Sequence, residues 1–234
     1  MIIVITGASK GLGKAIAEKF AADKQQHTII LNARNAHYLN ELRDDLLQNF
    51  PHQDVIVQQC DMSVKEYVLA FASFVNEIGV PDILINNAGS FIPGSVYNEP
   101  EGALEQMMNV NLFSAYHLTR ELLPEMMERH SGHIFNMCSI ASLKAYNNGG
   151  AYSISKFALA GFSKNLREEL KPYNIKVTSV YPGAAYTDSW SGSGVDPKRI
   201  MEARDIADMI HTSAYLSPTA CVEDIILRPQ LGDL

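Results

Sequence analysis

The sequence predicts an α/β protein, a single doubly wound domain in which about seven parallel strands are flanked by helices on both faces. Short apolar runs, most of them rich in β-branched residues, alternate along the chain with longer stretches of helical spacing. A glycine-rich turn follows the first run and opens a helix. Because strands that are covered on both faces are apolar throughout, these runs indicate a buried parallel sheet. The expected strands are Ile2–Thr6, His27–Asn32, Val55–Cys60, Ile83–Asn86, His133–Cys138, Ile175–Val180 and Ile225–Leu227.

Helical periodicity fills the segments between the expected strands. The first helix should run from about Leu12 to Ala22, and the helix after the fifth strand from Tyr152 to about Lys171. Apolar faces mark two further helices, one carrying Leu39, Leu42, Leu46 and Phe50, the other Val64, Val68, Phe71, Phe74, Val75 and Ile78. Residues 184–199 contain Ser, Gly, Asp and Pro between a strand and the next helix, which makes them a candidate mobile substrate loop.

Composition narrows the class of protein. A chain of 234 residues with 47% hydrophobic residues and a net charge of −7 can bury one large core and is not disordered. No apolar run reaches the length of a membrane span, and the first residues lack the features of a signal peptide. The acidic pI near 5.5 argues against nucleic-acid binding. Three scattered cysteines and seven histidines without ligand spacing argue against a disulfide framework or a metal site. We therefore expect residues 1–234 to form one soluble, cytoplasmic domain that acts on a small molecule.

The turn Thr6–Gly13 leads from the first strand into the first helix. Glycines let the backbone approach a pyrophosphate there, and the helix start offers free N–H groups. The pattern TGxxxGxG differs from the GxGxxG dinucleotide motif, because Ile16 stands at the third glycine. A tight turn that binds no ligand is the alternative interpretation. The cofactor-binding candidates in this turn are Gly7, Ser9, Lys10, Gly11, Leu12 and Gly13.

The end of the second strand favours NADP(H) over NAD(H). An NAD site normally carries an acidic residue here to bind the ribose 2′-hydroxyl. This chain has Ala33 followed by Arg34, whose guanidinium suits a 2′-phosphate. Lys10 in the glycine turn could add a second positive charge. A solvent-exposed arginine without a ligand is the alternative for Arg34 considered alone.

Three polar residues at one sheet edge are candidates for proton transfer. Tyr152 and Lys156 are spaced i and i+4 on a helix, so their side chains can converge. A nearby cation lowers the pKa of a phenol towards the useful range. Ser139 follows the fifth strand and could donate to a substrate carbonyl oxygen. Each residue alone could have a structural role, but their joint placement beside a nucleotide turn favours catalysis.

Taken together, these motifs resemble those of the classical short-chain dehydrogenase/reductase family over nearly the whole chain. The resemblance rests on TGASKGLG at Thr6–Gly13, NNAG at Asn86–Gly89, Asn111 in NVNL, Ser139 thirteen residues before the Tyr152-x-x-x-Lys156 motif, and Pro182-Gly183 followed by Thr187.

The resemblance implies a Rossmann-type fold, NADP(H) as the cofactor and a catalytic tetrad of Asn111, Ser139, Tyr152 and Lys156. Tyr152 would protonate the carbonyl oxygen, Ser139 would polarise the carbonyl, and Asn111 would position a water for proton relay. Lys156 would lower the pKa of Tyr152 and hold the nicotinamide ribose. Further cofactor contacts implied by the resemblance are Asp61, Met62, Asn87, Ala88, Gly89, Pro182, Gly183, Ala185 and Thr187.

The C-terminal half looks closest to sepiapterin-reductase-like members and other small carbonyl reductases. This implies hydride transfer between nicotinamide and a small carbonyl or alcohol, with a sepiapterin-like pterin ketone as the first candidate. A broad dicarbonyl and aldehyde reductase is one alternative, and a non-catalytic NADP-sensing protein is another. The substrate-pocket candidates are Phe91, Tyr146, Tyr186 and Trp190.

Two helical segments, Glu101–Arg129 and Ala151–Lys171, resemble those that pair across the two-fold axis of the family. They imply a homodimer or a homotetramer. The glycine-rich C-terminal tail usual in the family is replaced here by Leu227-Arg228-Pro229-Gln230, which puts in doubt any tetramer contact made by such a tail.

Overall fold

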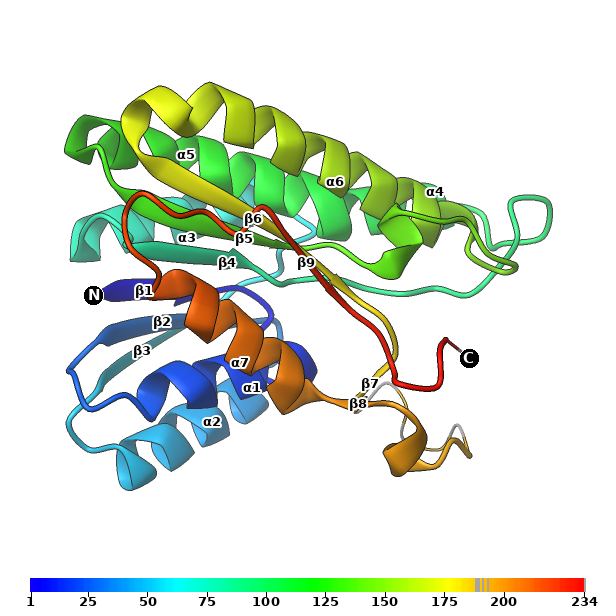
Figure 1. The fold of residues 1–234 in the computed structure, drawn as a ribbon, viewed down its shortest axis with the longest axis horizontal. Helices are drawn as coiled ribbons and strands as arrows, with labels where there is room; N and C mark the ends of the chain where they lie inside the picture. The colour runs from blue at the N-terminus through cyan, green and yellow to red at the C-terminus, as the bar shows by residue number, and fades with distance from the viewer. Residues whose placement is uncertain (188–189, 191, 193, 234) are drawn as a thin grey trace.

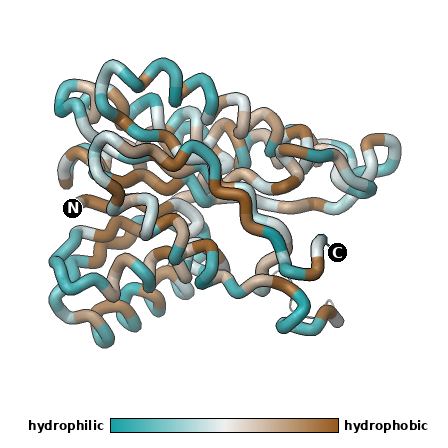
Figure 2. Tube along the Cα trace, viewed as in Figure 1, coloured by the Kyte–Doolittle hydropathy of each residue, from teal (hydrophilic) through white to brown (hydrophobic). Residues whose placement is uncertain are grey.

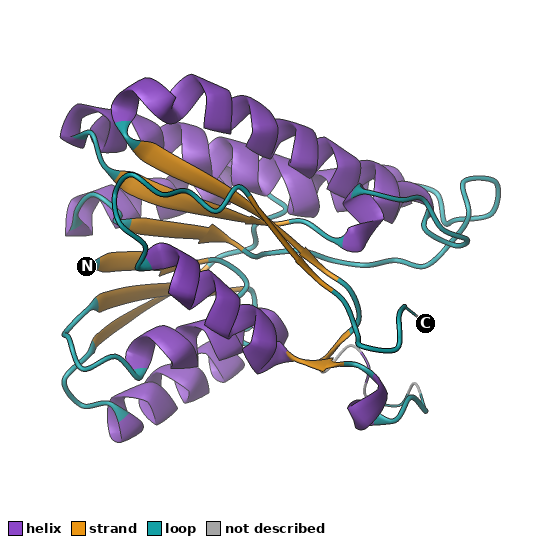
Figure 3. Cartoon of the chain, in the orientation of Figure 1, coloured by secondary structure: helices purple, strands orange, loops and turns teal. Residues whose placement is uncertain are grey.

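A single seven-stranded parallel sheet organises the computed structural model of the protein (Figures 1 and 3), which describes residues 1–187, 190, 192 and 194–233. The strand order is β3-β2-β1-β4-β5-β6-β9, and each neighbouring pair is parallel. The seven predicted strands are confirmed. Their bounds are β1 Ile2–Ile5, β2 Thr28–Ala33, β3 Asp54–Gln59, β4 Ile83–Asn86, β5 Gly132–Met137, β6 Ile175–Pro182 and β9 Asp224–Leu227.

Helices cover both faces of the sheet, as Figure 3 shows. Helices α1, α2 and α7 lie on one face, and α3, α5 and α6 lie on the other, with the short α4 beside α6 (Figure 1). The bounds of the helices are α1 Gly11–Ala21, α2 Ala36–Asn49, α3 Lys65–Ile78, α4 Ala103–Met108, α5 Ser114–Arg129, α6 Gly150–Leu170 and α7 Ala203–Ala214. The described segments also include 3₁₀ turns at Ile140–Ser142, Lys171–Tyr173 and Pro197–Arg199.

Side chains of successive residues in the central strands point to opposite faces of the sheet. Ile3 and Ile5 of β1 pack with α1, α2 and α7, whereas Val4 packs with α3 and α5. All three side chains are fully buried. The hydropathy colouring follows this arrangement, with apolar strands inside and polar outer helix turns (Figure 2). Burial on both faces explains why these strands are apolar throughout rather than alternating.

The segment predicted as one helix over Glu101–Arg129 is interrupted in the structure. Helix α4 ends at Met108, a π-helical turn covers Asn109–Phe113, and α5 begins at Ser114. The wider π turn places Asn111 inside the protein, where it is 1% exposed and its amide bonds to neighbouring segments. Sequence periodicity did not indicate this interruption, because an apolar face continues through the turn.

A short strand pair, which the sequence did not predict, lies beyond the end of β6. Strands β7 (Ala185–Tyr186) and β8 (Met201–Glu202) pair in parallel and hold together the two ends of the candidate substrate loop 184–199. Residues 188, 189, 191 and 193 of that loop lie outside the described residues. The predicted mobility of the loop stays a prediction.

The strand order reverses direction between β1 and β4, so the loops after these strands leave the sheet on opposite sides. Open parallel sheets bind ligands in the crevice outside such a point. Within the described part of the chain, no helix is both long and apolar enough to cross a membrane.

Candidate active site

The glycine turn between β1 and α1 is tightly packed. Gly7 has a φ of +65°, and a Cβ at Gly13 would overlap the Gly7 carbonyl oxygen and lie 2.5 Å from Asn87 Nδ2. Lys10 precedes α1 in an extended conformation, and among the described residues no side-chain hydrogen bond from Lys10 caps the helix. The first N–H groups of α1 therefore point into the crevice, which suits the pyrophosphate of a dinucleotide.

Asn87, in the turn after β4, braces the glycine turn. Its side-chain amide donates to the carbonyl oxygens of Thr6 at 2.9 Å and Gly7 at 3.0 Å. In return, the Thr6 hydroxyl accepts from the N–H groups of Asn87 at 3.1 Å and Ala88 at 3.0 Å. The side chain of Asn87 thus fixes the shape of the cofactor cradle by direct contact with its backbone.

Basic side chains gather where β2 ends. Ala33 is buried at the last position of β2, and Arg34 follows it in an exposed position. Lys10 reaches this region from the glycine turn, with its Nζ 3.9 Å from the centroid of the Tyr38 ring. Two cations and no carboxylate at the strand end are what a ribose 2′-phosphate requires.

Asp61 and Met62 follow β3 at the same edge of the sheet. The Asp61 carboxylate accepts from the N–H of Ser63 at 2.9 Å and from its hydroxyl at 2.8 Å, so its orientation is fixed by the local turn. Met62 is buried at 4% exposure. Both residues lie where the resemblance places the adenine contacts.

Tyr152, Ser139 and Lys156 converge beyond the end of β5. Tyr152 lies in the first turn of α6, and its side chain lies close enough to that of Ser139 to influence the pKa of the phenol. The Ser139 hydroxyl also accepts from the N–H of Ala141 at 3.1 Å, which fixes its rotamer at the start of the 3₁₀ turn. Lys156 Nζ is 5.8 Å from the centroid of the Tyr152 ring and donates to the carbonyl oxygen of Met137 at 2.7 Å.

Burial controls the protonation of this group. Desolvation raises the pKa of Tyr152, and the polar side chain of Ser139 opposes this effect. Desolvation also lowers the pKa of the buried Lys156 amine to about 8. In the structure desolvation sets the direction of the shift in the Tyr152 pKa, and the lowering of that pKa by Lys156 stays a prediction. A phenol that stays protonated at neutral pH is suited to donate a proton.

Asn111 bridges three segments around the site. Its Nδ2 donates to the Ser90 carbonyl oxygen at 3.0 Å and to the Ser155 hydroxyl at 2.9 Å, and its Oδ1 accepts from the Ser90 N–H at 2.8 Å. A Cβ at Gly89 would lie 3.2 Å from Asn111 Oδ1 and 3.6 Å from Lys156 Nζ. Asn111 therefore holds the loop after β4 against α6 and close to the lysine.

The segment after β6 contributes the opposite wall of the crevice. Pro182 ends β6, and the N–H of Gly183 donates to the Leu227 carbonyl oxygen at 2.7 Å. Ala185 pairs with Met201 in the β7–β8 ladder. A Cβ at Gly11 would lie 3.3 Å from the Thr187 side chain, so Thr187 adjoins the glycine turn.

Two of the four substrate-pocket candidates adjoin Tyr152. The Phe91 ring meets the Tyr152 ring edge-on with centroids 5.0 Å apart, and Phe91 is 54% exposed. Burial and the neighbouring Tyr152 raise the pKa of Tyr146 to about 12. Tyr186 is exposed in β7, and the N–H of Trp190 donates to the Thr187 carbonyl oxygen at 2.9 Å.

Glu99 is a contributor to the site that sequence reasoning missed. Its Oε2 accepts from the N–H of Ala151 at 2.9 Å, in the first turn of α6 and one residue before Tyr152. A Cβ at Gly94 would lie 2.7 Å from the Glu99 Cβ, and a Cβ at Gly150 would overlap the Glu99 carboxylate. A carboxylate at a helix N-terminus is stabilising, but here it comes from 52 residues away in the chain, so no local capping pattern reveals it.

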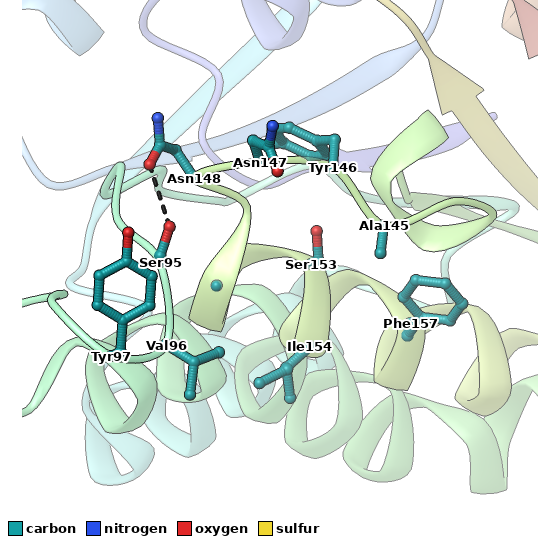
Figure 4. Close-up of a pocket in the computed structure, with 11 residues that line it drawn as sticks. Ser95, Val96, Tyr97, Ala145, Tyr146, Asn147, Asn148, Ser153, Ile154 and Phe157 are labelled. Atoms are coloured by element: carbon teal, nitrogen blue, oxygen red, sulfur yellow. Dashed lines mark hydrogen bonds between the residues drawn. The ribbon is translucent and has the colours of Figure 1, made fainter.

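A groove of about 590 Å³ lies beside this loop on the outer surface of α6 (Figure 4). Its described lining does not include Ser139, Tyr152 or Lys156, so it is separate from the proton-transfer group. Residues of the loop after β4, of the turn before α6 and of α6 itself form the walls: Ser95, Val96, Tyr97, Ala145, Tyr146, Asn147, Asn148, Gly150, Ser153, Ile154 and Phe157.

The fold and the site together define a class of protein. A doubly wound parallel sheet, an open helix N-terminus after a glycine turn, and a serine and a tyrosine beside a buried lysine are the parts of a nucleotide-dependent oxidoreductase.

Comparison with known proteins identifies the family within that class. The short chain dehydrogenase family matches residues 1–196, so the chain belongs to this family. The sepiapterin reductase of Chlorobaculum tepidum is 34% identical over 241 aligned residues, which cover 100% of this chain and 98% of that protein.

Solved structures agree with this assignment. A metagenomic short-chain oxidoreductase in complex with NADP superposes with a TM-score of 0.83 at 28% identity, covering 98% of this chain and 97% of that one. L-sorbose reductase from Gluconobacter frateurii, in complex with NADPH and L-sorbose, has a TM-score of 0.88 at 28% identity, with 97% and 94% of the two chains covered. Both structures hold NADP or NADPH, in agreement with the cofactor predicted from the sequence.

The contact between Glu99 and α6 leads to a testable prediction. In Glu99→Ala, the N–H of Ala151 loses its acceptor, and we expect unfolding free energy to fall by about 1 kcal/mol. Since Tyr152 follows directly, kcat for carbonyl reduction should fall about tenfold through misplacement of the phenol. Urea unfolding and steady-state kinetics measure the two effects. Glu99→Gln keeps an acceptor oxygen and should retain most of both properties.

The matched control is Glu101→Ala, since Glu101 is an exposed carboxylate in the same loop. Equal kcat values in Glu99→Ala and Glu101→Ala would contradict a role of Glu99 in holding the catalytic helix.

Proposed function

We propose that the protein is an NADP(H)-dependent reductase of small carbonyl compounds, with a pterin side-chain ketone like that of sepiapterin as the first substrate to test. One observation carries the proposal: Tyr152, whose pKa is raised by burial, lies beside Ser139 and the buried Lys156, with 5.8 Å between Lys156 Nζ and the ring centroid, at the sheet edge where the glycine turn opens. The likeness to a sepiapterin reductase supports the choice of ketone. Arg34 and Lys10 support NADP(H) over NAD(H).

The residues of the chain divide the work of reduction between binding and proton transfer. When bound, the nicotinamide supplies the hydride that reaches the carbonyl carbon. Ser139 donates a hydrogen bond to the carbonyl oxygen as negative charge develops there. Tyr152 transfers its phenolic proton to the same oxygen, which completes the alcohol and leaves a phenolate. The Lys156 ammonium stabilises that phenolate, and in alcohol oxidation each proton moves in the opposite direction.

A planar, aromatic substrate suits the surroundings of the phenol. The exposed ring of Phe91 adjoins the Tyr152 ring, and Tyr146, in the turn before α6, is near enough to Tyr152 for that residue to raise its pKa. Aromatic rings favour contact with flat heteroaromatic groups such as a pterin. A broad dicarbonyl and aldehyde reductase is the second candidate, because small dicarbonyls could receive a proton from Tyr152 without contacting the rings of Phe91 and Tyr146. A cytoplasmic location remains a prediction from the sequence.

Oxidation of NADPH followed at 340 nm tests the function. We expect turnover of sepiapterin, with NADH a poorer cofactor. In Tyr152→Phe, kcat/KM should fall on the order of 10²- to 10⁴-fold, because the general acid is lost, while NADPH binding persists. Diacetyl, isatin and simple aldehydes distinguish the candidates, since turnover of all of them favours the broad reductase. NADPH binding without any turnover would instead favour the sensing protein.

The pKa of Lys156 predicts how the reduction depends on pH. Because burial lowers that pKa to about 8, the ammonium is present below this pH and is lost as the pH rises through it. We therefore expect kcat/KM for reduction to be level from pH 6 to 7.5 and to fall above about pH 8. In Lys156→Arg the charge persists, so the fall should move to higher pH. A wild-type profile that stays level to pH 9.5 would contradict this assignment.

We further propose that the chain forms a homodimer through the face made by α4, α5 and α6. Exposed apolar side chains from α4, the π turn and α6 lie on this face, including Leu104, Phe113, Ile154 and Phe157. A second groove of about 490 Å³, between α5 and α6, adjoins the same face and is lined by Leu112, Phe113, Tyr116, His117, Ala158 and Phe162. Pairing of two copies would cover these apolar surfaces.

Phe157→Glu should disrupt such a dimer, because it places a charge in the apolar face. Light scattering should give twice the chain mass of 25.9 kDa for the wild type and the single mass for the variant. Tyr67→Glu changes an aromatic residue on α3 that is 56% exposed, against 45% for Phe157, and this variant should remain dimeric. A wild-type mass of one chain at every concentration would contradict the dimer, and a mass of four chains would favour the homotetramer.

A further inference from the structure

The Lys10 ammonium lies over the face of the Tyr38 ring, with 3.9 Å between Nζ and the ring centroid. This is a close cation–π contact. Elsewhere in the protein, Arg120 Cζ lies 5.3 Å from the centroid of the Tyr116 ring. The two residues come from different elements, since Lys10 precedes α1 and Tyr38 lies in the first turn of α2. The contact therefore joins the glycine turn to the helix that follows β2.

The backbone holds the Tyr38 ring in a fixed place. Asn35 caps α2, and its side-chain oxygen accepts from the N–H of Tyr38 at 3.2 Å. The next residue, Leu39, is 1% exposed in the core and bonds through its N–H to the Asn35 carbonyl oxygen. Tyr38 itself is 40% exposed, so its ring lies at the surface, where the Lys10 ammonium covers one face.

The position of the ring determines where the lysine charge is held. An exposed lysine samples many rotamers, and fixing it costs conformational entropy when an anion binds. The contact with Tyr38 holds the ammonium beside the first turn of α2, four residues after Arg34. Because β2 ends at Ala33, this is the edge at which a dinucleotide presents its adenosine ribose.

We propose that Tyr38 is a positioning residue for cofactor specificity: its ring face holds the Lys10 ammonium in place for the 2′-phosphate of NADP(H). Arg34 then supplies the bidentate contact to the phosphate, and Lys10 supplies a second, pre-positioned charge. Tyr38 needs no direct contact with the cofactor to act in this way. The inference rests on the NADP(H) site proposed above, and it assigns a role to a residue that no glycine motif or strand-end pattern includes.

Calorimetric titration of the full chain with 2′,5′-ADP and with 5′-AMP tests the proposal directly, because the two ligands differ only in the 2′-phosphate. In Tyr38→Leu we expect the Kd for 2′,5′-ADP to rise about three- to tenfold, with the Kd for 5′-AMP unchanged. Tyr38→Phe keeps the ring face and should bind both ligands as the wild type does. In a Lys10→Ala background, Tyr38→Leu should cause no further loss.

Three results would overturn the role of Tyr38. The first is an equal loss of affinity for both ligands in Tyr38→Leu, which would indicate a general structural effect on the site. The second is a loss that persists in the Lys10→Ala background, and the third is no loss at all. A wild-type protein that binds 2′,5′-ADP no more tightly than 5′-AMP would instead show that the underlying NADP(H) site is wrong.

Discussion

The close packing of the turn after β4 against the glycine turn is the constraint on which the rest of the site depends. Gly13 approaches the Gly7 carbonyl oxygen and the Asn87 amide so closely that a methyl group would not fit, and the Thr6 hydroxyl accepts two N–H groups from the other turn. This contact joins neighbouring strands at the point where their connections diverge. It fixes where α1 begins and where the loop that carries Phe91 and Glu99 leaves the sheet. The positions of the predicted cofactor cradle and of the predicted proton donor therefore both depend on this contact.

Burial, more than charge pairing, determines the chemistry at the other side of that contact. An isolated lysine–tyrosine pair would favour the phenolate, whereas the structure raises the pKa of the tyrosine and lowers that of the lysine. Both shifts follow from the cost of placing charge in a site with little water. The result is a neutral phenol beside a lysine whose pKa is about 8. Such a pair can give one proton to a substrate with a small change in local charge. The nearby Ser139 side chain limits the rise in the pKa of Tyr152.

The sequence predicted what is local and periodic. The seven strands follow from apolar runs, and the convergence of Tyr152 with Lys156 follows from helical spacing alone. What the sequence could not reveal depends on contacts between distant segments. Glu99 reaches α6 from the loop after β4. Lys10, just before α1, contacts Tyr38 in the first turn of α2. The π turn at Asn111 was missed for a related reason: it is stabilised by Ser90 and Ser155, which periodicity within the helix does not register. The same limit applies to the pKa of Tyr152, because the burial that raises it is a tertiary property that helical spacing does not register.

The division between fixed and variable parts of the site bears on substrate choice. Cofactor contacts come from turns that are locked to the sheet edge, whereas Phe91 and Tyr146 come from the longer segments after β4 and before α6. Both rings adjoin Tyr152 without belonging to the proton-transfer group, so a change in either can reshape the substrate wall and leave the proton donor in place. Loops on a shared fold commonly carry such differences in substrate, because they vary more than the elements that they connect. This arrangement also explains why the reaction class follows from the sheet edge, while the identity of the carbonyl compound must be sought in the loops.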